Sequence, residues 1–383
     1  ADLKNHLKLL AGNPDTEWDP LITGVGLSAL YACTMAAKSI SEGNVDIVMA
    51  STAYGGSSQQ SDILANKLEG ITKHTFDIQG DSDVLESLRT KLGLMAKRHN
   101  DAIGNVTIIQ IEYPTNPDMK DVDLAALEKV CNAYEEATGS KVLLVLDTTF
   151  SPQSKPLRFL KEIPVMVFNS LSKSVSGGLD TGGALVASGN EFAQKVLRWA
   201  HVHAKLSGSY ATAHQLKVFN KMYSTVETRI EDAHKNAKNA VTILKEAVKD
   251  CTGSKMKVNF VTVAQIGKGV KPATFSFNLP VPSGSQYKGD PSNLAQDFVD
   301  LLVKNADDKV IPCVSFGQDG NKIYVTVPST STQGAISEKD KAEQAVDGVQ
   351  LVRISCPTNM DIADFKKALT ETLSSLYSLK SRL

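Results

Sequence analysis

The sequence predicts an α/β protein in which a mostly parallel β-sheet carries helices on both faces and a smaller α/β domain follows toward the carboxyl terminus. Short apolar segments alternate with helical stretches from about residue 27 to residue 187, which is the pattern of parallel strands joined by helices. After residue 254 the pattern changes, and strand-like segments are interleaved with fewer helices. A length of 383 residues corresponds to two or three domains at about 150 residues each.

The individual elements follow from hydrophobic periodicity. In the larger domain, expected at 23–235, we place helices at 27–40, 81–97 and 124–137 and strands at 46–51, 106–112, 141–147, 164–169 and 183–187. Residues 191–249 are rich in Ala, Lys, Glu and Leu and predict a long connecting helix. In the smaller domain, expected at 236–383, we place strands at 257–263, 273–278 and 322–327 and helices near 291–305 and 361–379.

Composition and charge argue against several classes of function. The formal net charge is −1, which gives no indication of nucleic acid or of an anionic membrane surface as a partner. The five cysteines are scattered, odd in number and without a C-x-x-C pair, which argues against a disulfide framework and a zinc site and indicates a reducing compartment. No apolar run approaches the roughly 20 residues of a membrane span, and the first residues lack a signal-peptide pattern. We therefore expect a cytoplasmic protein without a metal.

A lysine in a segment rich in hydroxyls and glycines is the strongest indication of chemistry. Lys173 follows Ser170 and Ser172, and it lies downstream of Asp147, which ends the apolar run 141–147. Pyridoxal phosphate is an electron sink when a lysine holds it as an imine, its pyridine nitrogen stays protonated and its phosphate is hydrogen-bonded. Lys173 would hold the imine and Asp147 would pair with the pyridinium, while the two serines would donate to the phosphate. A solvated lysine in a loop is the alternative, which the combination with Asp147 disfavours.

Three further segments fit the same site. Gly24 and Val25 precede an apolar helical stretch, and a helix amino terminus attracts a phosphate. Tyr54 follows a short strand, where ligands of open α/β sheets gather, and would stack on the cofactor ring. Asn116 lies between two prolines in a turn that would point its amide at the cofactor. Each also has an ordinary structural interpretation as a loop or turn residue.

Four ordered segments carry a resemblance to a known family: EYPTNP at 112–117, LDTTFSP at 146–152, NSLSKSVSG at 169–177 and LVRIS at 351–355. From about residue 23 onward the chain resembles the cysteine/methionine-metabolism (trans-sulfuration) enzymes. That family includes cystathionine lyases, methionine γ-lyase, cystathionine γ-synthase and the O-acetylhomoserine sulfhydrylases. The resemblance implies the type I, aspartate-aminotransferase-like fold of pyridoxal-phosphate enzymes and a small-molecule amino-acid substrate.

The resemblance also implies a role for each candidate site residue. Lys173, Tyr54 and Asp147 would be catalytic, and Arg353 would take the substrate α-carboxylate with help from Ser315. A planar guanidinium is suited to clamp a carboxylate at two points. The residues that would bind the cofactor are Gly24, Val25, Tyr54, Asn116, Asp147, Ser170, Ser172 and Lys173.

The amino-terminal segment departs from the family. Relatives carry a Tyr-x-Arg motif on an arm that reaches the cofactor phosphate of a neighbouring subunit, whereas residues 8–14 here read KLLAGNP. We expect residues 1–22 to be a shortened arm, which would lower cofactor affinity, alter the dimer contact or leave the phosphate clamp to other basic residues. The resemblance otherwise implies a homodimer or homotetramer.

The turn at 315–317 favours one reaction over its relatives. Ser315-Phe316-Gly317 looks more like the Ser-Leu-Gly turn of the lyases than the Asn-Val-Gly of many sulfhydrylases. We therefore predict a carbon–sulfur lyase that performs β- or γ-elimination on a sulfur amino acid such as cystathionine, methionine or cysteine. The alternatives are a γ-replacement transferase of the cystathionine γ-synthase or O-acetylhomoserine sulfhydrylase type, an aminotransferase of the same fold and a non-catalytic family member.

Overall fold

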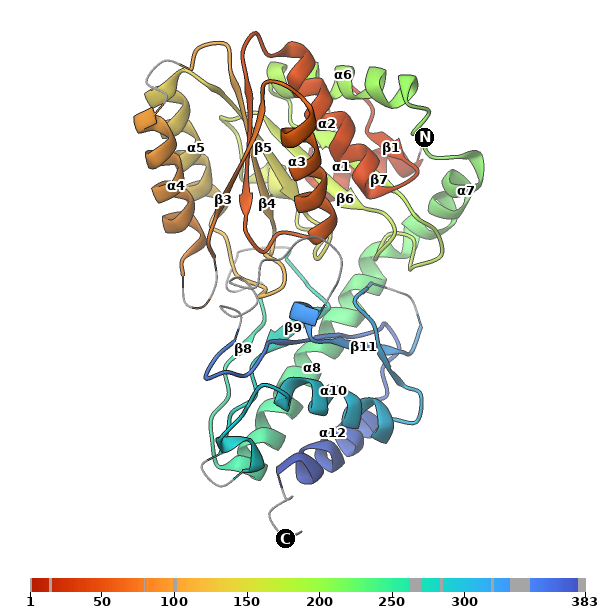
Figure 1. The fold of residues 1–383 in the computed structure, drawn as a ribbon. Helices are drawn as coiled ribbons and strands as arrows, with labels where there is room; N and C mark the ends of the chain where they lie inside the picture. Colours follow the sequence, from red (N-terminus) through yellow and green to blue (C-terminus); the bar gives the residue numbers. More distant parts are fainter. Residues whose placement is uncertain are drawn as a thin grey trace.

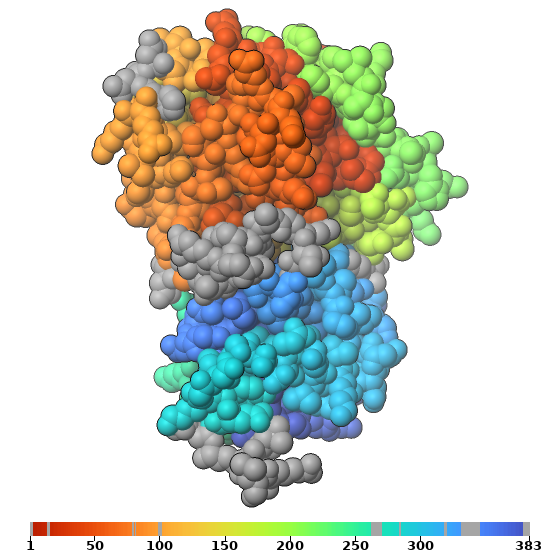
Figure 2. All heavy atoms as spheres, in the orientation of Figure 1, coloured from red at the N-terminus to blue at the C-terminus, as the bar shows by residue number. Residues whose placement is uncertain are grey.

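The chain forms two lobes connected by the long helix α8 (Val226–Thr252) (Figure 1). The computed structural model describes residues 2–13, 16–78, 80, 82–98, 102–261, 270–282, 285–317, 320–330 and 345–377. Figure 2 shows the division on the surface, where the red-to-green residues form one lobe and the cyan-to-blue residues form the other. The predicted α/β class, with a mostly parallel sheet, helices on both faces and a second, smaller domain, is confirmed.

The larger lobe is built on a seven-stranded sheet in the order β1-β7-β6-β5-β4-β2-β3. Strands β6, β5, β4, β2 and β3 run parallel, and β7 is antiparallel to both of its neighbours. The strands are β1 (Leu21–Thr23), β2 (Val45–Ala50), β3 (Ile71–Phe76), β4 (Val106–Glu112), β5 (Lys141–Asp147), β6 (Val165–Ser170) and β7 (Gly183–Ala187).

Alternation along β5 explains why both faces of this sheet are covered. Leu144 and Leu146 belong to one buried cluster and Leu143 and Val145 to another, because successive side chains of a strand point to opposite faces. The first face is covered by α1 (Asp2–Ala11), α4 (Val84–Arg98), α5 (Leu124–Thr138), α7 (Ala213–Met222) and the start of α8. The second face is covered by α2 (Gly26–Ile40), α3 (Gly55–Lys67) and α6 (Glu191–Leu206).

The smaller lobe has its own sheet and its own core. Its strand order is β10-β11-β12-β9-β8, and Phe277 of β9 meets Phe298 of α10 edge to face at 5.7 Å. The core changes within α8, where Ile230 belongs to the larger lobe and Ala237 to the smaller. The elements are β8 (Val258–Asn259), β9 (Thr274–Phe277), α10 (Leu294–Asn305), β10 (Val310–Pro312), β11 (Ile323–Thr326), β12 (Val352–Ser355) and α12 (Ile362–Tyr377). Single 3₁₀ turns are η1 (Pro156–Arg158), η2 (Tyr223–Thr225), η3 (Gln286–Lys288) and η4 (Pro328–Thr330).

Segment 191–249 is mostly helical, as its composition predicts, but it is divided among α6, α7 and the greater part of α8, and the long connecting helix is α8 alone. Gly208 has a φ of +64°, a left-handed conformation that ends a helix readily. The chain then restarts at Thr212, whose side chain and that of Gln215 cap each other's backbone N–H groups. Of the strand predicted at 257–263, residues 258–259 form β8, and residues 262 and 263 lie outside the described residues.

The amino-terminal segment packs onto the larger lobe. Leu3, Leu7 and Leu10 of α1 are buried in the cluster that covers the first face of the sheet, and Leu10 O accepts a hydrogen bond from Lys155 N at 3.0 Å. Strand β1 then pairs with β7. Within the described part of the chain, none of the helices has the length and apolar character needed to span a bilayer.

Candidate active site

Parallel pairing brings the chemistry-bearing residues to one edge of the larger sheet. Glu112, the last residue of β4, lies opposite Asp147, the last of β5, and Asp147 lies opposite Phe168 of β6. The loops that leave these carboxyl ends carry the predicted site residues, as expected for open parallel sheets.

Asp147 is a buried carboxylate with one unoccupied oxygen. Its Oδ1 accepts from the backbone N–H of Thr149 at 2.9 Å and from the Thr149 hydroxyl at 2.5 Å. Burial raises the pKa of Asp147 to about 6. No described residue donates to Oδ2 or forms an ion pair with this side chain. Because a buried carboxylate is costly without a partner, Oδ2 suits a cationic N–H such as a pyridinium.

Lys173 is held by the smaller lobe. Its Nζ donates to Ser315 Oγ at 2.7 Å and lies 5.1 Å from the centre of the Phe316 ring. Burial lowers the pKa of Lys173, and the charge of Arg353 lowers it further, which favours the neutral, nucleophilic amine. Gly317 allows this approach, since it has a φ of +77° and a methyl group on it would lie 2.7 Å from Ser174 N.

The lysine loop is also fixed by Arg229, a residue that the sequence interpretation missed. Arg229 in α8 donates to the carbonyl oxygens of Ser174 at 2.8 Å and Val175 at 3.1 Å. Nothing in the sequence around Arg229 indicates such a contact. A cation with several fixed donors is well suited to hold consecutive carbonyls of a loop.

Arg353 of β12 presents a buried guanidinium. Its Nη1 donates to Asn116 Oδ1 at 2.9 Å and its Nη2 to Val314 O at 2.5 Å. The guanidinium lies 5.9 Å from the Phe150 ring and 5.7 Å from the Phe316 ring, and these two rings stack at 4.2 Å. It forms no ion pair with a described carboxylate. Burial lowers its pKa to about 10, so the side chain still carries its positive charge near neutral pH. A buried cation without a counter-ion is suited to an anionic ligand.

Glu112 connects two predicted site residues and was itself not assigned a role from the sequence. Its Oε1 accepts from Tyr54 N at 2.8 Å and its Oε2 from Asn116 N at 3.3 Å. Burial, and then the Asp147 charge, raise the pKa of Glu112. Burial and both carboxylates raise the pKa of Tyr54, whose side chain is 39% exposed at the site. A carboxylate at the end of an otherwise apolar strand is the sequence signal that would have identified Glu112.

The predicted phosphate end lies at the start of α2. No side chain caps the first N–H groups of this helix, and a methyl group on Gly26 would lie 3.6 Å from Ser170 Oγ. Ser170 is also joined to the Asp147 side of the site, since its N–H donates to Thr149 Oγ1 at 3.0 Å. Free helix N–H groups beside a hydroxyl suit a phosphate. The structure therefore brings Gly24, Val25 and Ser170 together here.

Ser172 makes its hydrogen bonds to a glycine outside the predicted site. Its hydroxyl accepts from Gly182 N at 3.0 Å and lies 3.4 Å from Gly182 O. Its role toward a phosphate stays a prediction. The structure connects Lys173 with Ser315 and, through the backbone, with Ser170. It also connects Arg353 with Asn116, and Tyr54 with Asn116 through Glu112.

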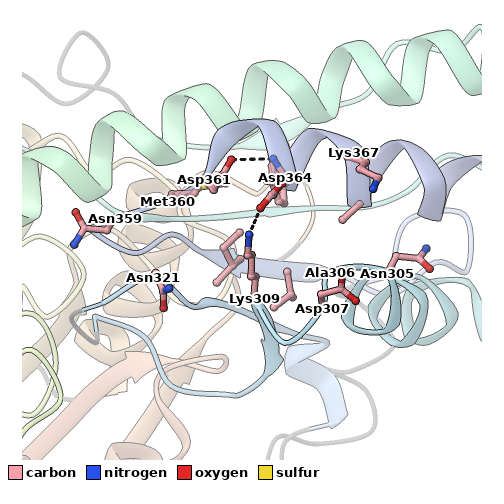
Figure 3. A pocket seen from close by; sticks show the side chains of 14 residues that line it. Asn305, Ala306, Asp307, Lys309, Asn321, Asn359, Met360, Asp361, Asp364 and Lys367 are labelled. Atoms are coloured by element: carbon pink, nitrogen blue, oxygen red, sulfur yellow. Dashed lines mark hydrogen bonds and ion pairs between the residues drawn. The ribbon is translucent and has the colours of Figure 1, made fainter.

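A separate cavity lies in the smaller lobe. It has a volume of about 530 Å³, and Figure 3 shows an ion pair between Lys309 and Asp364 inside it. The sequence-predicted site residues do not line it. The reactive groups therefore gather at the sheet edge and not in this cavity.

Comparisons with known proteins agree with this geometry. Residues 19–374 match the model of the family described as Cys/Met metabolism PLP-dependent enzyme. The chain is 24% identical over 360 residues to a cystathionine β-lyase of Staphylococcus haemolyticus, covering 91% of this chain and 78% of that protein. It is 32% identical over 141 residues to a cystathionine γ-lyase of Saccharomyces cerevisiae, covering 36% of this chain and 30% of the relative.

Solved structures show the same fold. The crystal structure of a cystathionine γ-synthase from Xanthomonas oryzae pv. oryzae superposes with a TM-score of 0.70 at 23% identity, covering 97% of this chain and 84% of the other. The match of the family model over nearly the whole chain settles the assignment: the protein belongs to the Cys/Met metabolism family of pyridoxal-phosphate-dependent enzymes.

Proposed function

We propose that the protein is a carbon–sulfur lyase that performs β- or γ-elimination on a sulfur amino acid such as cystathionine, methionine or cysteine. The observation that carries the proposal is that Lys173 Nζ and the Arg353 guanidinium face the same Phe316 ring, 5.1 and 5.7 Å from its centre. An amine that can take a proton thus lies beside a cation that can hold a carboxylate. A relative aligned over 91% of this chain is named a cystathionine β-lyase, which favours elimination.

The residues present fit the cofactor. Bound pyridoxal phosphate supplies an electron sink that makes the substrate Cα proton acidic. Asp147, whose Oδ2 accepts from no described residue, would hold the ring nitrogen in its protonated form. Ser170 and the N–H groups at the start of α2 would hold the phosphate, and Lys173 would hold the cofactor aldehyde until substrate replaces it.

The chain's own groups then divide the work of elimination. Arg353 would bind the substrate α-carboxylate and so orient the Cα–H bond toward Lys173 Nζ, which would accept that proton. Tyr54, through its hydroxyl, would protonate the departing thiolate. A positioned base typically contributes about 10²- to 10⁴-fold in rate. The released unsaturated amino acid hydrolyses to a 2-oxo acid and ammonia, which balances the reaction.

The first experiment tests the cofactor site. Purified protein incubated with pyridoxal phosphate should show a visible imine absorbance that borohydride removes, and Lys173→Ala should lack it. Lys67→Ala, at an exposed lysine of α3, is the matched control and should behave as wild type. A wild-type protein that stays colourless would contradict the proposal.

The second experiment separates a lyase from its relatives. A panel of cystathionine, methionine and cysteine is assayed for thiol, 2-oxo acid and ammonia, with and without an O-acylhomoserine and an added thiol. Equal amounts of 2-oxo acid and ammonia are expected from a lyase. Product that appears only when the acylated substrate and thiol are both present would instead identify a transferase, and 2-oxo acid without ammonia would identify transamination.

We also propose a homo-oligomer in a reducing, cytoplasmic compartment. Val25, Tyr54 and Tyr210 are 45%, 39% and 40% exposed, and apolar groups beside a site favour coverage by a second copy. All five cysteines are free, which suits a reducing compartment. Light scattering coupled to gel filtration measures the mass, and a monomer at micromolar concentration would contradict the first point.

A further inference from the structure

One side chain holds the phosphate-binding turn from a neighbouring helix. Gln215, in the first turn of α7, accepts at Oε1 from the backbone N–H and the hydroxyl of Thr212, at 2.9 and 3.2 Å. Its Nε2 donates to the carbonyl oxygens of Gly24 and Thr181, at 2.9 Å each. A side-chain amide has two donors and two acceptor positions, so all four are used. The reversed amide would place two donors against each other at Thr212 N, which determines the orientation.

The contact with Gly24 orients the next peptide group. The Gly24 carbonyl oxygen accepts from Gln215 and also from the Thr181 hydroxyl at 2.9 Å. In a trans peptide, the carbonyl of one residue and the N–H of the next point in opposite directions. The N–H of Val25 therefore points away from Gln215, and it donates to no described residue.

Gly24 itself is oriented by a second contact. Its N–H donates to Ser209 O at 3.0 Å, in the segment that leads into α7. The N–H of Gly24 is consequently occupied, and the donor left for an anion on this turn is that of Val25, just before α2. Of the two residues expected to supply phosphate-binding backbone, Val25 therefore has the available N–H, whereas that of Gly24 is used within the protein.

We propose that Gln215 is a positioning residue for the cofactor phosphate: by holding the Gly24 carbonyl, it directs the Val25 N–H and the start of α2 toward the phosphate. The inference rests on the proposed function, which places the phosphate at this turn beside Ser170. The chain thereby prepares the phosphate site with an amide of its own lobe. Capping of α7 alone would require only the contacts between Gln215 and Thr212.

The experiment compares two variants that share the capping role. Gln215→Ala removes the donations to Gly24 and Thr181, whereas Thr212→Ala disrupts the cap but leaves Nε2 of Gln215 in place. The affinity for pyridoxal phosphate is measured by absorbance titration and by the rate of cofactor loss on dilution. Gln215→Ala should bind about tenfold more weakly, since one to two hydrogen bonds are lost, and Thr212→Ala should bind as wild type.

Pyridoxal, which lacks the phosphate, identifies the end of the cofactor that is affected. Wild type and Gln215→Ala should bind pyridoxal equally. Gln215→Glu keeps the acceptor toward Thr212 and loses both donors. It should therefore weaken pyridoxal phosphate binding at least as much as Gln215→Ala does. Saturating cofactor should restore kcat in each variant, because no group that touches the substrate changes.

Two results would overturn the inference. If Gln215→Ala and Thr212→Ala weaken cofactor binding equally, Gln215 acts only as a helix cap. If Gln215→Ala weakens the binding of pyridoxal and of pyridoxal phosphate equally, its effect does not involve the phosphate. Circular dichroism and thermal unfolding confirm that each variant is folded. If wild type binds no pyridoxal phosphate, the proposed function fails, which is a different outcome from unchanged binding in Gln215→Ala.

Discussion

Arg353 and Asn116 are joined by a 2.9 Å hydrogen bond between residues 237 positions apart. Arg353 lies on β12 of the smaller lobe, and Asn116 follows β4 of the larger one. The guanidinium that would take the substrate carboxylate is therefore oriented by a side-chain amide of the lobe that would hold the cofactor. In the proposed function, Asn116 would therefore lie between the substrate carboxylate and the cofactor.

Arg353→Lys should weaken substrate binding and leave cofactor binding intact. An ammonium cannot reach Asn116 Oδ1, Val314 O and a carboxylate with the planar geometry of a guanidinium. The expected loss in kcat/KM is about 10- to 100-fold, from one charge-assisted hydrogen bond, and it should appear mainly in KM. Steady-state kinetics measure it, with Arg98→Lys at an exposed position of α4 as the control. An unchanged KM would remove Arg353 from the substrate site.

The sequence predicted which loops gather at one edge of the larger sheet, and the reason is physical. A buried parallel strand is an apolar run with a polar residue where it ends, and Asp147 marks such an end. The loops after β2, β4, β5 and β6 were thus expected to share one site, and the structure has them at one edge. Strands β1 and β10 have three residues each, which is too short for a periodicity to be recognised.

Contacts between distant segments could not be predicted from the pattern. The T-x-x-Q capping signature at Thr212 and Gln215 predicts a helix start, yet nothing in it indicates that Gln215 also reaches Gly24, 191 positions away. The stack of Phe150 on Phe316 likewise depends on how the two lobes meet. Residue types and local spacing determine elements, whereas these pairs depend on the packing of the whole chain.

Glu112→Gln should change how stability depends on pH in the cofactor-free protein. Burial and the Asp147 charge raise the pKa of Glu112 to about 8 in the folded state, from an ordinary value of 4.5. The folded state then holds the proton more tightly, so the contribution of Glu112 is fully present below about pH 4.5 and is lost as the pH rises to about 8. Glutamine does not titrate, so the stability of the variant relative to wild type should increase across this window. Urea unfolding at several pH values measures it.

A second carboxylate provides the control for this pH window. Asp147→Asn removes the like charge and should lower the pKa of Glu112, so that the window ends at a lower pH. In Glu112→Gln, the amide nitrogen of the new side chain cannot accept from Asn116 N or Tyr54 N. The loss of this acceptor lowers stability by an amount that is the same at every pH. A constant difference between wild type and Glu112→Gln from pH 5 to pH 8 would show that Glu112 does not titrate there.

Phe316→Leu tests whether the aromatic ring between the two cations does more than fill space. The variant keeps an apolar side chain in the turn but loses the stack on Phe150 at 4.2 Å and the ring faces toward Lys173 and Arg353. Aromatic pairs contribute about 0.5–1.5 kcal/mol beyond burial, and each cation over a ring contributes about 0.5–1 kcal/mol when exposed. The free energy of unfolding should therefore fall by about 1.5–3.5 kcal/mol.

The functional consequence of Phe316→Leu should be seen in substrate binding. With the ring removed, the guanidinium of Arg353 keeps its hydrogen bonds to Asn116 and Val314 but loses the surface that restricts its plane. KM should rise several-fold, because the binding free energy lost is smaller than that of one hydrogen bond. The affinity for pyridoxal phosphate should stay unchanged. Phe159→Leu, at a 42% exposed position, is the matched control. An unchanged KM together with unchanged stability would mean that leucine serves this turn equally well, and the aromatic stack would have no part in orienting Arg353.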